Sequence, residues 1–292
     1  MNLKQRLNQP EILIAPGAYD AFTAKLIENS GFEAVYLSGA GVSYSTFGTP
    51  DVGITTATQM IDRVESIADA INLPLIADID TGYGNAINLH NTVIKYERAG
   101  ASAIQLEDQQ FPKRCGHLAG KELIPTREMV GKIHAATDAR RSNDFVIIAR
   151  TDARSVFGLD AAIDRAGAYL EAGADMLFVE SPYSSEELRT VAEAFPGVPL
   201  MANMVEGGKT PLHSAGELQE MGYAFVIFPN SLTRLFARAG LEFLAQFREQ
   251  GTTEPQLDRM MHFKDLNNML GIEDFRALER AYLPPKEEEV VS

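Results

Sequence analysis

The sequence predicts an α/β protein folded as a (β/α)8 barrel of the TIM type. Short apolar runs alternate with amphipathic segments of helical period through most of the chain, which is typical of parallel strands joined by helices. Eight such units fit the 292 residues as one barrel better than as two small domains. In addition, a glycine separates several predicted helices from the next strand, where a left-handed residue commonly ends a helix.

Each predicted strand is a short apolar run, and an amphipathic segment lies between it and the next strand. The strands are predicted at Ile12–Ala15, Ala34–Leu37, Leu75–Asp80, Ala103–Glu107, Phe145–Arg150, Met176–Glu180, Leu200–Asn203 and Phe225–Phe228. The helices are predicted near Ala18–Ser30, Thr56–Ile71, Ile87–Ala99, Thr126–Ala139, Leu159–Ala172, Ser185–Ala194, Ala215–Met221 and Ser231–Gln250. Strand and helix therefore repeat in order along the chain.

Glycine positions favour the barrel over its main alternative, a doubly wound open sheet. Gly31, Gly100, Gly173 and Gly222 each follow a predicted helix and precede a predicted strand. An open sheet would need a glycine-rich phosphate-binding turn after the first strand. The segment Pro16–Asp20 is not such a turn.

Three parts of the chain are predicted: a catalytic barrel over residues 1–250, a helical extension over 251–283 and a disordered acidic tail over 284–292. In the extension, Glu254–Leu270 and Glu273–Tyr282 are predicted to be helical. The apolar residues in this part are too many for a free tail, so we expect them to pack on the barrel or on another subunit. They are Met260, Met261, Phe263, Leu266 and Met269.

Composition excludes several classes of function. The net charge is −14 and the isoelectric point is near 4.8, which argues against nucleic acid or an anionic membrane as the main partner. No apolar run reaches the length of a membrane span, and the N-terminus lacks a signal-peptide core. Cys115 is the single cysteine, which suits a reducing compartment. We therefore expect a cytoplasmic enzyme.

Two carboxylates, Asp78 and Asp80, stand two residues apart at the end of the third predicted strand. Because side chains alternate along a strand, we expect both to point to the same side. Like charges in an apolar element need positive charge between them, and hard oxygen ligands suit Mg²⁺ or Mn²⁺. The alternative is that one aspartate caps the next helix and the other pairs with an arginine.

Charged and polar residues gather where the predicted strands end, whereas the strand bodies are almost uncharged. In a barrel these ends lie on one face, and that face carries the active site. For Asp108, Asp152 and Ser231 the alternative is a helix cap. The residues at these ends are Tyr36, Ser38, Gly39, Asp78, Asp80, Glu107, Asp108, Arg150, Asp152, Glu180, Asn203, Glu206, Pro229, Asn230 and Ser231.

The segment after the fourth predicted strand, residues 109–118, has unusual chemistry. It places Lys113, Arg114, Cys115 and His117 within five residues. The cations would lower the pKa of the thiol and hold anionic groups, so one interpretation is a loop that carries a proton donor to a bound anion. A Cys–His nucleophile and an incidental solvated basic loop are the alternatives. One cysteine and one histidine do not make a zinc pattern.

Five motifs stand out along the chain: Tyr36–Gly39, Asp78–Gly84, Leu106–Gln109, Lys113–His117 and Ala149–Ala153. Together these motifs resemble the isocitrate lyase/phosphoenolpyruvate mutase superfamily. The resemblance covers about residues 10–250 and looks most like its short bacterial branch, which holds 2-methylisocitrate lyase, 2,3-dimethylmalate lyase, oxaloacetate-cleaving relatives and carboxyphosphonoenolpyruvate mutase. The combination of the acidic motif with the Lys-Arg-Cys-Gly-His block is specific.

The resemblance implies a modified barrel, a homotetramer whose C-terminal helix is exchanged between subunits, and a small carboxylate substrate. It implies that Asp78, Asp80 and Glu107 hold Mg²⁺, partly through water, and that Cys115 is the proton donor. Tyr36 is our candidate for the base, and Arg150 would hold the reacting oxygens. The predicted substrate-binding residues are Ser38, Gly39, Ala40, Asp51, Arg114, Gly116, His117, Arg150, Glu180, Asn203, Thr210 and Ser231.

The leading functional hypothesis is a Mg²⁺-dependent lyase that splits a branched 2-hydroxy di- or tricarboxylate into pyruvate or a related 2-keto acid and a carboxylate. The loop at Glu206–Pro211 departs from the methylisocitrate lyases and is closer to dimethylmalate lyases and carboxyphosphonoenolpyruvate mutases. The alternatives are a phosphonomutase of the carboxyphosphonoenolpyruvate or phosphoenolpyruvate type, an oxaloacetate decarboxylase or hydrolase, and a silent barrel that binds a keto acid.

Overall fold

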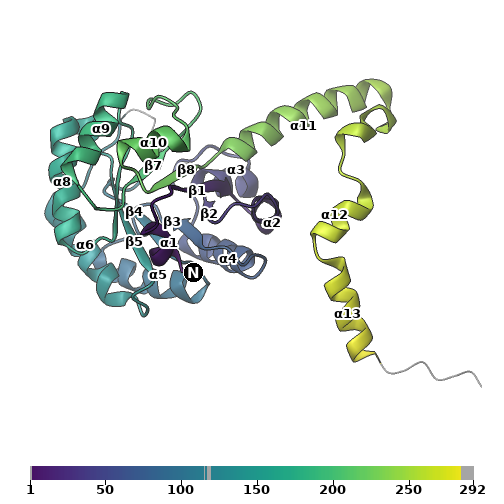
Figure 1. The fold of residues 1–292 in the computed structure, drawn as a ribbon, viewed down its shortest axis with the longest axis horizontal. Helices are drawn as coiled ribbons and strands as arrows, with labels where there is room; N and C mark the ends of the chain where they lie inside the picture. Colours follow the sequence, from purple (N-terminus) through teal and green to yellow (C-terminus); the bar gives the residue numbers. More distant parts are fainter. Residues whose placement is uncertain (1, 115, 117–119, 284–292) are drawn as a thin grey trace, which may run out of the picture. The chain divides into compact units, whose positions relative to one another are not determined.

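Eight parallel strands form a nearly closed barrel with helices between them, which confirms the predicted (β/α)8 fold (Figure 1). The structure is a computed structural model that describes residues 2–114, 116 and 120–283. The predicted acidic tail at 284–292 therefore lies outside the described residues. The strands are β1 (Leu13–Ala18), β2 (Val35–Leu37), β3 (Leu75–Asp78), β4 (Ala103–Glu107), β5 (Val146–Thr151), β6 (Met176–Val179), β7 (Met201–Asn203) and β8 (Phe225–Phe228).

The strands follow the order β6-β5-β4-β3-β2-β1-β8-β7, and every ladder is parallel. The last gap, between β6 and β7, is bridged by the isolated parallel pair Leu177 and Leu200. All strand carboxyl ends therefore lie on one face of the barrel, where the sequence places the polar residues.

The third strand is shorter than predicted. It ends at Asp78, and Asp80 has a φ of 49°, in the left-handed region. A turn begins here, in which the backbone N–H of Gly82 donates to the carbonyl of Ile79 at 2.9 Å. The predicted strand end at Asp80 is therefore wrong, but the two carboxylates do lie on the same side, because a Cβ on Gly39 would stand 3.2 Å from Asp78 Oδ2 and 3.7 Å from Asp80 Oδ1. The turn still keeps the two together, since the Asp80 N–H donates to Asp78 Oδ1 at 3.0 Å.

Most helices match the predicted segments within a few residues. The glycines predicted to end helices have the positive φ that this position favours, from 82° at Gly31 to 104° at Gly222. The matching helices are α2 (Ala21–Asn29), α4 (Ala57–Ala68), α5 (Ala86–Arg98), α6 (Thr126–Ala139), α8 (Leu159–Glu171), α9 (Ser185–Ala194), α10 (Ala215–Met221) and α11 (Ser231–Gln250).

Three short helices were not predicted: α1 (Leu3–Leu7), α3 (Gly39–Phe47) and α7 (Arg154–Phe157). The helix α3 begins with glycines, whose helix propensity is poor, so propensity hides it. It is fixed instead by its ends, because Ser38 caps its N-terminus and Gly48 ends it with a φ of 64°.

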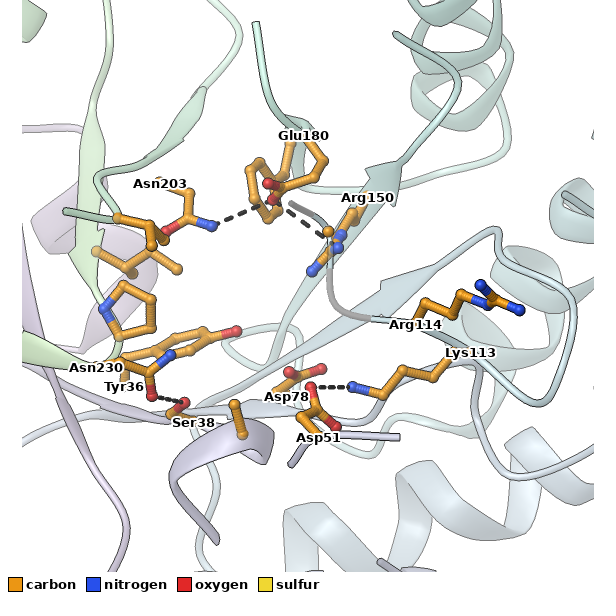
Figure 2. Close-up of a pocket in the computed structure, with 16 residues that line it drawn as sticks. Tyr36, Ser38, Asp51, Asp78, Lys113, Arg114, Arg150, Glu180, Asn203 and Asn230 are labelled. Atoms are coloured by element: carbon orange, nitrogen blue, oxygen red, sulfur yellow. Dashed lines mark hydrogen bonds and ion pairs between the residues drawn. The ribbon is translucent and has the colours of Figure 1, made fainter. Parts of the chain in front are cut away.

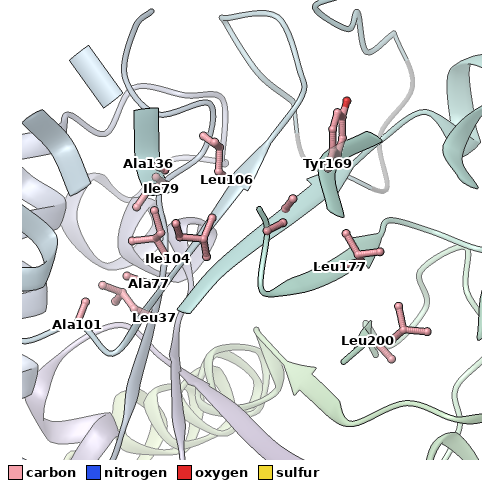
Figure 3. Close-up of a cluster of buried hydrophobic side chains, with 14 of the residues drawn as sticks. Leu37, Ala77, Ile79, Ala101, Ile104, Leu106, Ala136, Tyr169, Leu177 and Leu200 are labelled. Atoms are coloured by element: carbon pink, nitrogen blue, oxygen red, sulfur yellow. The ribbon is translucent and has the colours of Figure 1, made fainter. Parts of the chain in front are cut away.

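The core has two layers. Outward-facing strand residues pack against the surrounding helices, as Figure 3 shows for Ile104, Leu106 and Leu177 among others. Inward-facing residues such as Ile76 and Val146 form a second cluster that includes Leu3 and Leu7 of α1. The helix α1 thus closes the N-terminal end of the barrel.

The chain divides into two compact units, Met1–Phe236 and Ala237–Ser292. The second holds most of α11 and then η1 (Glu254–Arg259), α12 (Phe263–Met269) and α13 (Ile272–Tyr282). The single helix predicted over Glu254–Leu270 is thus wrong, because the chain forms a 3-10 helix and α12 there, with an extended Met260 between them. Within the described residues, no helix is both long and apolar enough to span a membrane.

Candidate active site

A polar pocket opens at the carboxyl ends of the strands (Figure 2). Its residues come from β2, β3, β5, β6, β7 and β8 and from the segments that follow β2, β4, β6, β7 and β8. Side chains from sequence positions far apart therefore meet on one face of the barrel. The lining residues are Tyr36, Ser38, Ala40, Asp51, Asp78, Lys113, Arg114, Gly116, Arg150, Phe178, Glu180, Asn203, Val205, Ile227, Pro229 and Asn230.

Most of the predicted site residues line this pocket, but five of the described ones do not. Asp80 and Glu107 lie outside the lining but form ion pairs with residues in it. Asp80 pairs with Lys113, and Glu107 pairs with Arg150. Cys115 and His117 lie outside the described residues. The other three predicted residues outside the lining are Gly39, Thr210 and Ser231.

Those three residues have other surroundings. Gly39 packs behind Asp78, because a Cβ added to Gly39 would lie 3.2 Å from Asp78 Oδ2. Thr210 is buried, and the Ser231 hydroxyl donates to the carboxylate of Glu206. Substrate contact by Gly39, Thr210 and Ser231 stays a prediction.

The carboxylates of the site are buried and crowded. Asp78 and Glu107 are 8% and 1% exposed. Burial and then the neighbouring Asp80 raise the pKa of Asp78 to about 6. Burial likewise raises the pKa of Glu107 well above its ordinary value, although Arg150 opposes that rise. The cluster therefore requires positive charge to stay ionised.

Lys113 supplies part of that charge. Its ammonium lies 2.7 Å from Asp51 Oδ2 and 2.8 Å from Asp80 Oδ1, and the side chain is 4% exposed. Burial lowers the pKa of Lys113, but Asp80 and Asp51 outweigh burial and raise it well above its ordinary value. Lys113 therefore joins the segment after β4 to the loop that carries Asp51, and it is a site residue that our list of candidates lacked.

The donors fit a hydrated divalent cation. Glu107 Oε1 and Asp80 Oδ1 are buried and have no hydrogen-bond donor among the described residues, and the Lys113 contact to Asp80 is an ion pair outside hydrogen-bond angles. No three acidic or histidine side chains of the described residues converge closely enough to hold a metal alone. Because Mg²⁺ keeps several waters and uses one or two carboxylates, these residues suit it with water completing its shell.

Arg150 stands at the centre of the site, at the end of β5. It donates through Nε and Nη2 to Asp152, at 2.9 and 3.1 Å. Its Nη1 lies 3.3 Å from Glu107, and its Nη2 lies 3.9 Å from Glu180. This fork fixes the guanidinium so that it faces the pocket beside the carboxylates.

Asp108 and Asp152, for which helix capping was the alternative, do not cap helices. Asp152 is fully buried and binds Arg150 and Lys121. Asp108 Oδ2 accepts from Thr151, Tyr169 and Arg165, at 2.7, 2.7 and 3.1 Å. Both therefore brace the strand end that carries Arg150.

The N-terminus of α3 also borders the pocket, which Ser38 and Ala40 line. The Ser38 hydroxyl accepts from the N–H of Gly41 at 3.2 Å and donates to Asn230 at 3.0 Å (Figure 2). The first amides of a helix have no acceptor within the helix, so those of Gly39 and Ala40 can bind a carboxylate.

Tyr36 holds its proton. Its hydroxyl donates to Gln105 Oε1 at 2.9 Å, and burial together with Asp78 raises its pKa well above the ordinary value. A neutral phenol is a poor proton acceptor, so these surroundings weigh against the base role. That role stays a prediction.

Sequence reasoning also missed the apolar side of the pocket, formed by Phe178, Val205, Ile227 and Pro229. Phe178 and Ile227 lie in strands and could not be told from core residues by pattern. Only the barrel geometry shows that their side chains point into the pocket.

These features define an α/β barrel with a charged, polar pocket at the carboxyl ends of its strands. The chain matches the phosphoenolpyruvate phosphomutase family model over residues 3–248, and it belongs to the phosphoenolpyruvate mutase/isocitrate lyase superfamily. The predicted resemblance is therefore confirmed.

Curated relatives and solved structures agree. The chain is 46% identical to a 2,3-dimethylmalate lyase of Eubacterium barkeri, covering 96% of each chain. It is 45% identical to a probable 2-methylisocitrate lyase of Corynebacterium glutamicum, covering 95% of this chain and 90% of that one. A solved 2,3-dimethylmalate lyase superposes with a TM-score of 0.90 at 38% identity, covering 96% and 93%. A phosphonopyruvate hydrolase complex with oxalate and Mg²⁺ superposes with a TM-score of 0.88 at 35% identity, covering 97% and 98%.

Proposed function

We propose that this protein is a Mg²⁺-dependent carbon–carbon lyase that cleaves a branched 2-hydroxy di- or tricarboxylate of the 2,3-dimethylmalate or 2-methylisocitrate type. The observation that carries the proposal is the cluster of Asp78, Asp80 and Glu107. Asp78 lines the pocket with Arg150 and Ala40 of α3, and Glu107 contacts Arg150 from outside the lining. Relatives named as lyases support the reaction class.

The groups around the pocket suit the two ends of such a substrate. The amides of Gly39 and Ala40 bind the carboxylate next to the hydroxyl, and Arg150 holds the hydroxyl oxygen. Arg114, Gly116, Glu180 and Asn203 would surround the far carboxylate. The family resemblance predicts the same role for His117, which lies outside the described residues. Asn203 is oriented by its bond to Glu180 at 3.2 Å.

Asp78, Asp80 and Glu107 would hold Mg²⁺, or Mn²⁺, partly through water. When bound, the cation lowers the pKa of the substrate hydroxyl and steadies the keto acid that forms. A base removes the hydroxyl proton, and the oxygen becomes a carbonyl as the carbon–carbon bond breaks. The bonding electrons pass into the carboxylate of the leaving fragment, and Cys115 then protonates the carbon. A Cys115→Ser variant with full turnover would remove the thiol from this scheme.

The test of the reaction is a keto-acid release assay. Purified protein with Mg²⁺ is offered 2,3-dimethylmalate, 2-methylisocitrate, isocitrate, oxaloacetate and 2-methylmalate, with EDTA as the control. We expect turnover of a methylated acid, which EDTA abolishes and added Mg²⁺ restores. If none of the five acids released a keto acid, the proposal would be contradicted.

The apolar wall of Val205, Ile227 and Pro229 favours a substrate with an alkyl branch over oxaloacetate or a phosphonate. The same assay distinguishes them. Cleavage of oxaloacetate alone would indicate the hydrolase or decarboxylase, and a phosphonate product detected by ³¹P NMR would indicate the phosphonomutase. A Val205→Asp variant should lose the methylated acid first, because burying a carboxylate beside a methyl group is costly.

We also propose a homotetramer in which the C-terminal part of one chain packs against a neighbour. The second unit exposes large apolar side chains, including Phe263 at 85% and Phe275 at 67%. Such residues commonly mark a contact surface. The cytoplasmic location, which rests on the single cysteine, stays a prediction.

A further inference from the structure

Lys121 does not line the pocket, but it is bound to two groups that lie against Arg150. Its side chain is 1% exposed. The ammonium donates to the backbone carbonyl of Gly116 at 2.5 Å and to Asp152 Oδ1 at 2.7 Å. A buried cation therefore joins the segment after β4 to the carboxylate that holds Arg150.

Asp152 transmits this contact to the guanidinium. Its two oxygens accept from Arg150 Nε and Nη2, and Oδ1 is shared between Arg150 and Lys121. Burial would raise the pKa of Asp152, but Arg150 and Lys121 outweigh it and lower the pKa to about 2. The carboxylate thus stays ionised and keeps both cations in place.

Gly116, the other partner of Lys121, packs against the side chains of Arg150 and Glu180, which we propose to bind the substrate. A Cβ on Gly116 would stand 2.6 Å from Arg150 Nη2 and 2.7 Å from Glu180 Cδ. Its carbonyl also accepts from Ser181 Oγ at 3.4 Å. The position of this backbone therefore determines how much room Arg150 and Glu180 leave for a substrate.

We propose that Lys121 is a positioning residue, whose one ammonium sets both the backbone at Gly116 and, through Asp152, the orientation of Arg150. It touches no reacting atom itself. The inference rests on the proposed function, in which Arg150 holds the substrate oxygens.

The chain offers a control with the same kinds of partner, on a lysine side chain that is 40% exposed. Lys4, at the opposite end of the barrel, also binds one carboxylate and one backbone carbonyl, Asp175 Oδ1 at 2.8 Å and Asn143 O at 3.1 Å. Lys4→Met removes the same kinds of bond far from the pocket. Lys121→Met and Lys121→Arg are the test variants, because arginine restores a cation and methionine keeps only the length.

The first readout is turnover of whichever acid the wild-type protein cleaves. We expect Lys121→Met to lower kcat/KM by about 100-fold, because a misplaced Arg150 loses its hold on the substrate oxygens. Lys121→Arg should recover at least about ten-fold of that loss, and Lys4→Met should stay within about two-fold of wild type. Equal losses of kcat/KM in Lys121→Met and Lys4→Met would overturn the proposal.

The second readout needs no activity. Cys115 is the single cysteine and adjoins Gly116 in sequence, so its alkylation rate by iodoacetamide reports on the backbone that Lys121 holds. Lys121→Met should raise this rate several-fold at a temperature where circular dichroism shows a folded protein, and Lys4→Met should not. An unchanged rate would overturn the inference even if the protein cleaves no hydroxy acid, whereas a raised rate without turnover would point to failure of the proposed function alone.

Discussion

Arg150 acts in the site through the shape of its guanidinium as much as through its charge. Two of its nitrogens bind Asp152, and a third faces Glu107. Lysine cannot reproduce this planar fork. We predict that Arg150→Lys lowers kcat/KM by about 100-fold or more, measured with the acid that the wild-type protein cleaves.

Arg154 provides the control for that substitution. It also follows β5 and makes a fork to Glu187, at 2.7 and 2.6 Å, but it does not line the pocket. Arg154→Lys should leave kcat/KM within about two-fold of wild type. If both variants lost activity equally, the fork at Arg150 would have no special role in binding.

Asp152 gives a prediction about stability. Asp152→Asn leaves Arg150 and Lys121 buried without their shared counter-charge, which should cost about 3–5 kcal/mol in the free energy of unfolding. The pKa of Asp152 is about 2 in the folded protein, below the value of about 3.9 for an unfolded chain. The unfolded state therefore takes up the proton first as the pH falls.

It follows that the stability from the Asp152 carboxylate is fully present above about pH 5 and is lost as the pH falls through about 3.9 towards about 2. Urea unfolding of wild type and Asp152→Asn should show a difference in unfolding free energy that shrinks between about pH 5 and pH 2.5. Comparing the two proteins cancels the titrating groups that the Asp152 charge does not influence. A difference that stayed constant over this range would contradict the assignment.

Tyr36 can be tested as the base by removing its hydroxyl alone. If Tyr36 accepts the substrate proton, Tyr36→Phe should lower kcat by about 100-fold or more. If it only donates to Gln105, as its raised pKa suggests, the loss should be about ten-fold or less. Steady-state kinetics of the pure variant decide between the two roles.

The sequence predicts residue types at the strand ends better than it predicts their geometry. Asp78 and Arg150 were found because charge at the end of an apolar run is unusual. Asp80 was placed on the wrong structural element, since no pattern showed that its backbone would take a left-handed φ of 49°. Lys121 was missed because a lysine in a polar segment gives no sign that it will be buried.

At the scale of elements, α1 closes the N-terminal end of the barrel. Leu3 is 2% exposed and belongs to the inner cluster of the core. We predict that Leu3→Ala lowers the free energy of unfolding by about 2–4 kcal/mol, through lost burial and the cavity it leaves. Because the pocket lies at the other end of the strands, kcat should stay within about two-fold of wild type.

Ile87 is the matched control, since it is 80% exposed on α5. Ile87→Ala should change the free energy of unfolding by less than about 0.5 kcal/mol. Urea unfolding measures both variants. If Leu3→Ala lost more than about two-fold in kcat at a temperature where it is folded, α1 would do more than close the barrel.

The predictable elements are those with strong periodicity or clear ends. All eight strands were found because buried parallel strands are continuous apolar runs, and α11 was predicted with its observed bounds. In contrast, α1 has five residues and α7 has four, too few for a periodic signal. The helix α3 depends on its caps, which no apolar pattern shows.

At the scale of the whole molecule, α13 carries an apolar face. Phe275, Leu278 and Tyr282 lie at helical spacing and are 67%, 52% and 82% exposed. If this face contacts a neighbour in a tetramer, Phe275→Glu with Leu278→Glu should shift the mass measured by light scattering to a smaller species. Ile87→Glu, at a position of the barrel that is 80% exposed, should leave the mass unchanged. A wild-type protein with the mass of one chain would contradict the tetramer.

One feature of the barrel bears on how its substrate range could change. Between β6 and β7 the sheet is held by the single bridge of Leu177 and Leu200. Glu180 follows β6 and Asn203 ends β7, so the two groups that we propose to lie beside the far carboxylate stand on opposite sides of this gap. Substitutions that widen it would break few sheet hydrogen bonds, so we expect longer or shorter acids to be accommodated there without changes to the proposed metal ligands. A directed-evolution library aimed at new hydroxy acids should therefore concentrate on this gap.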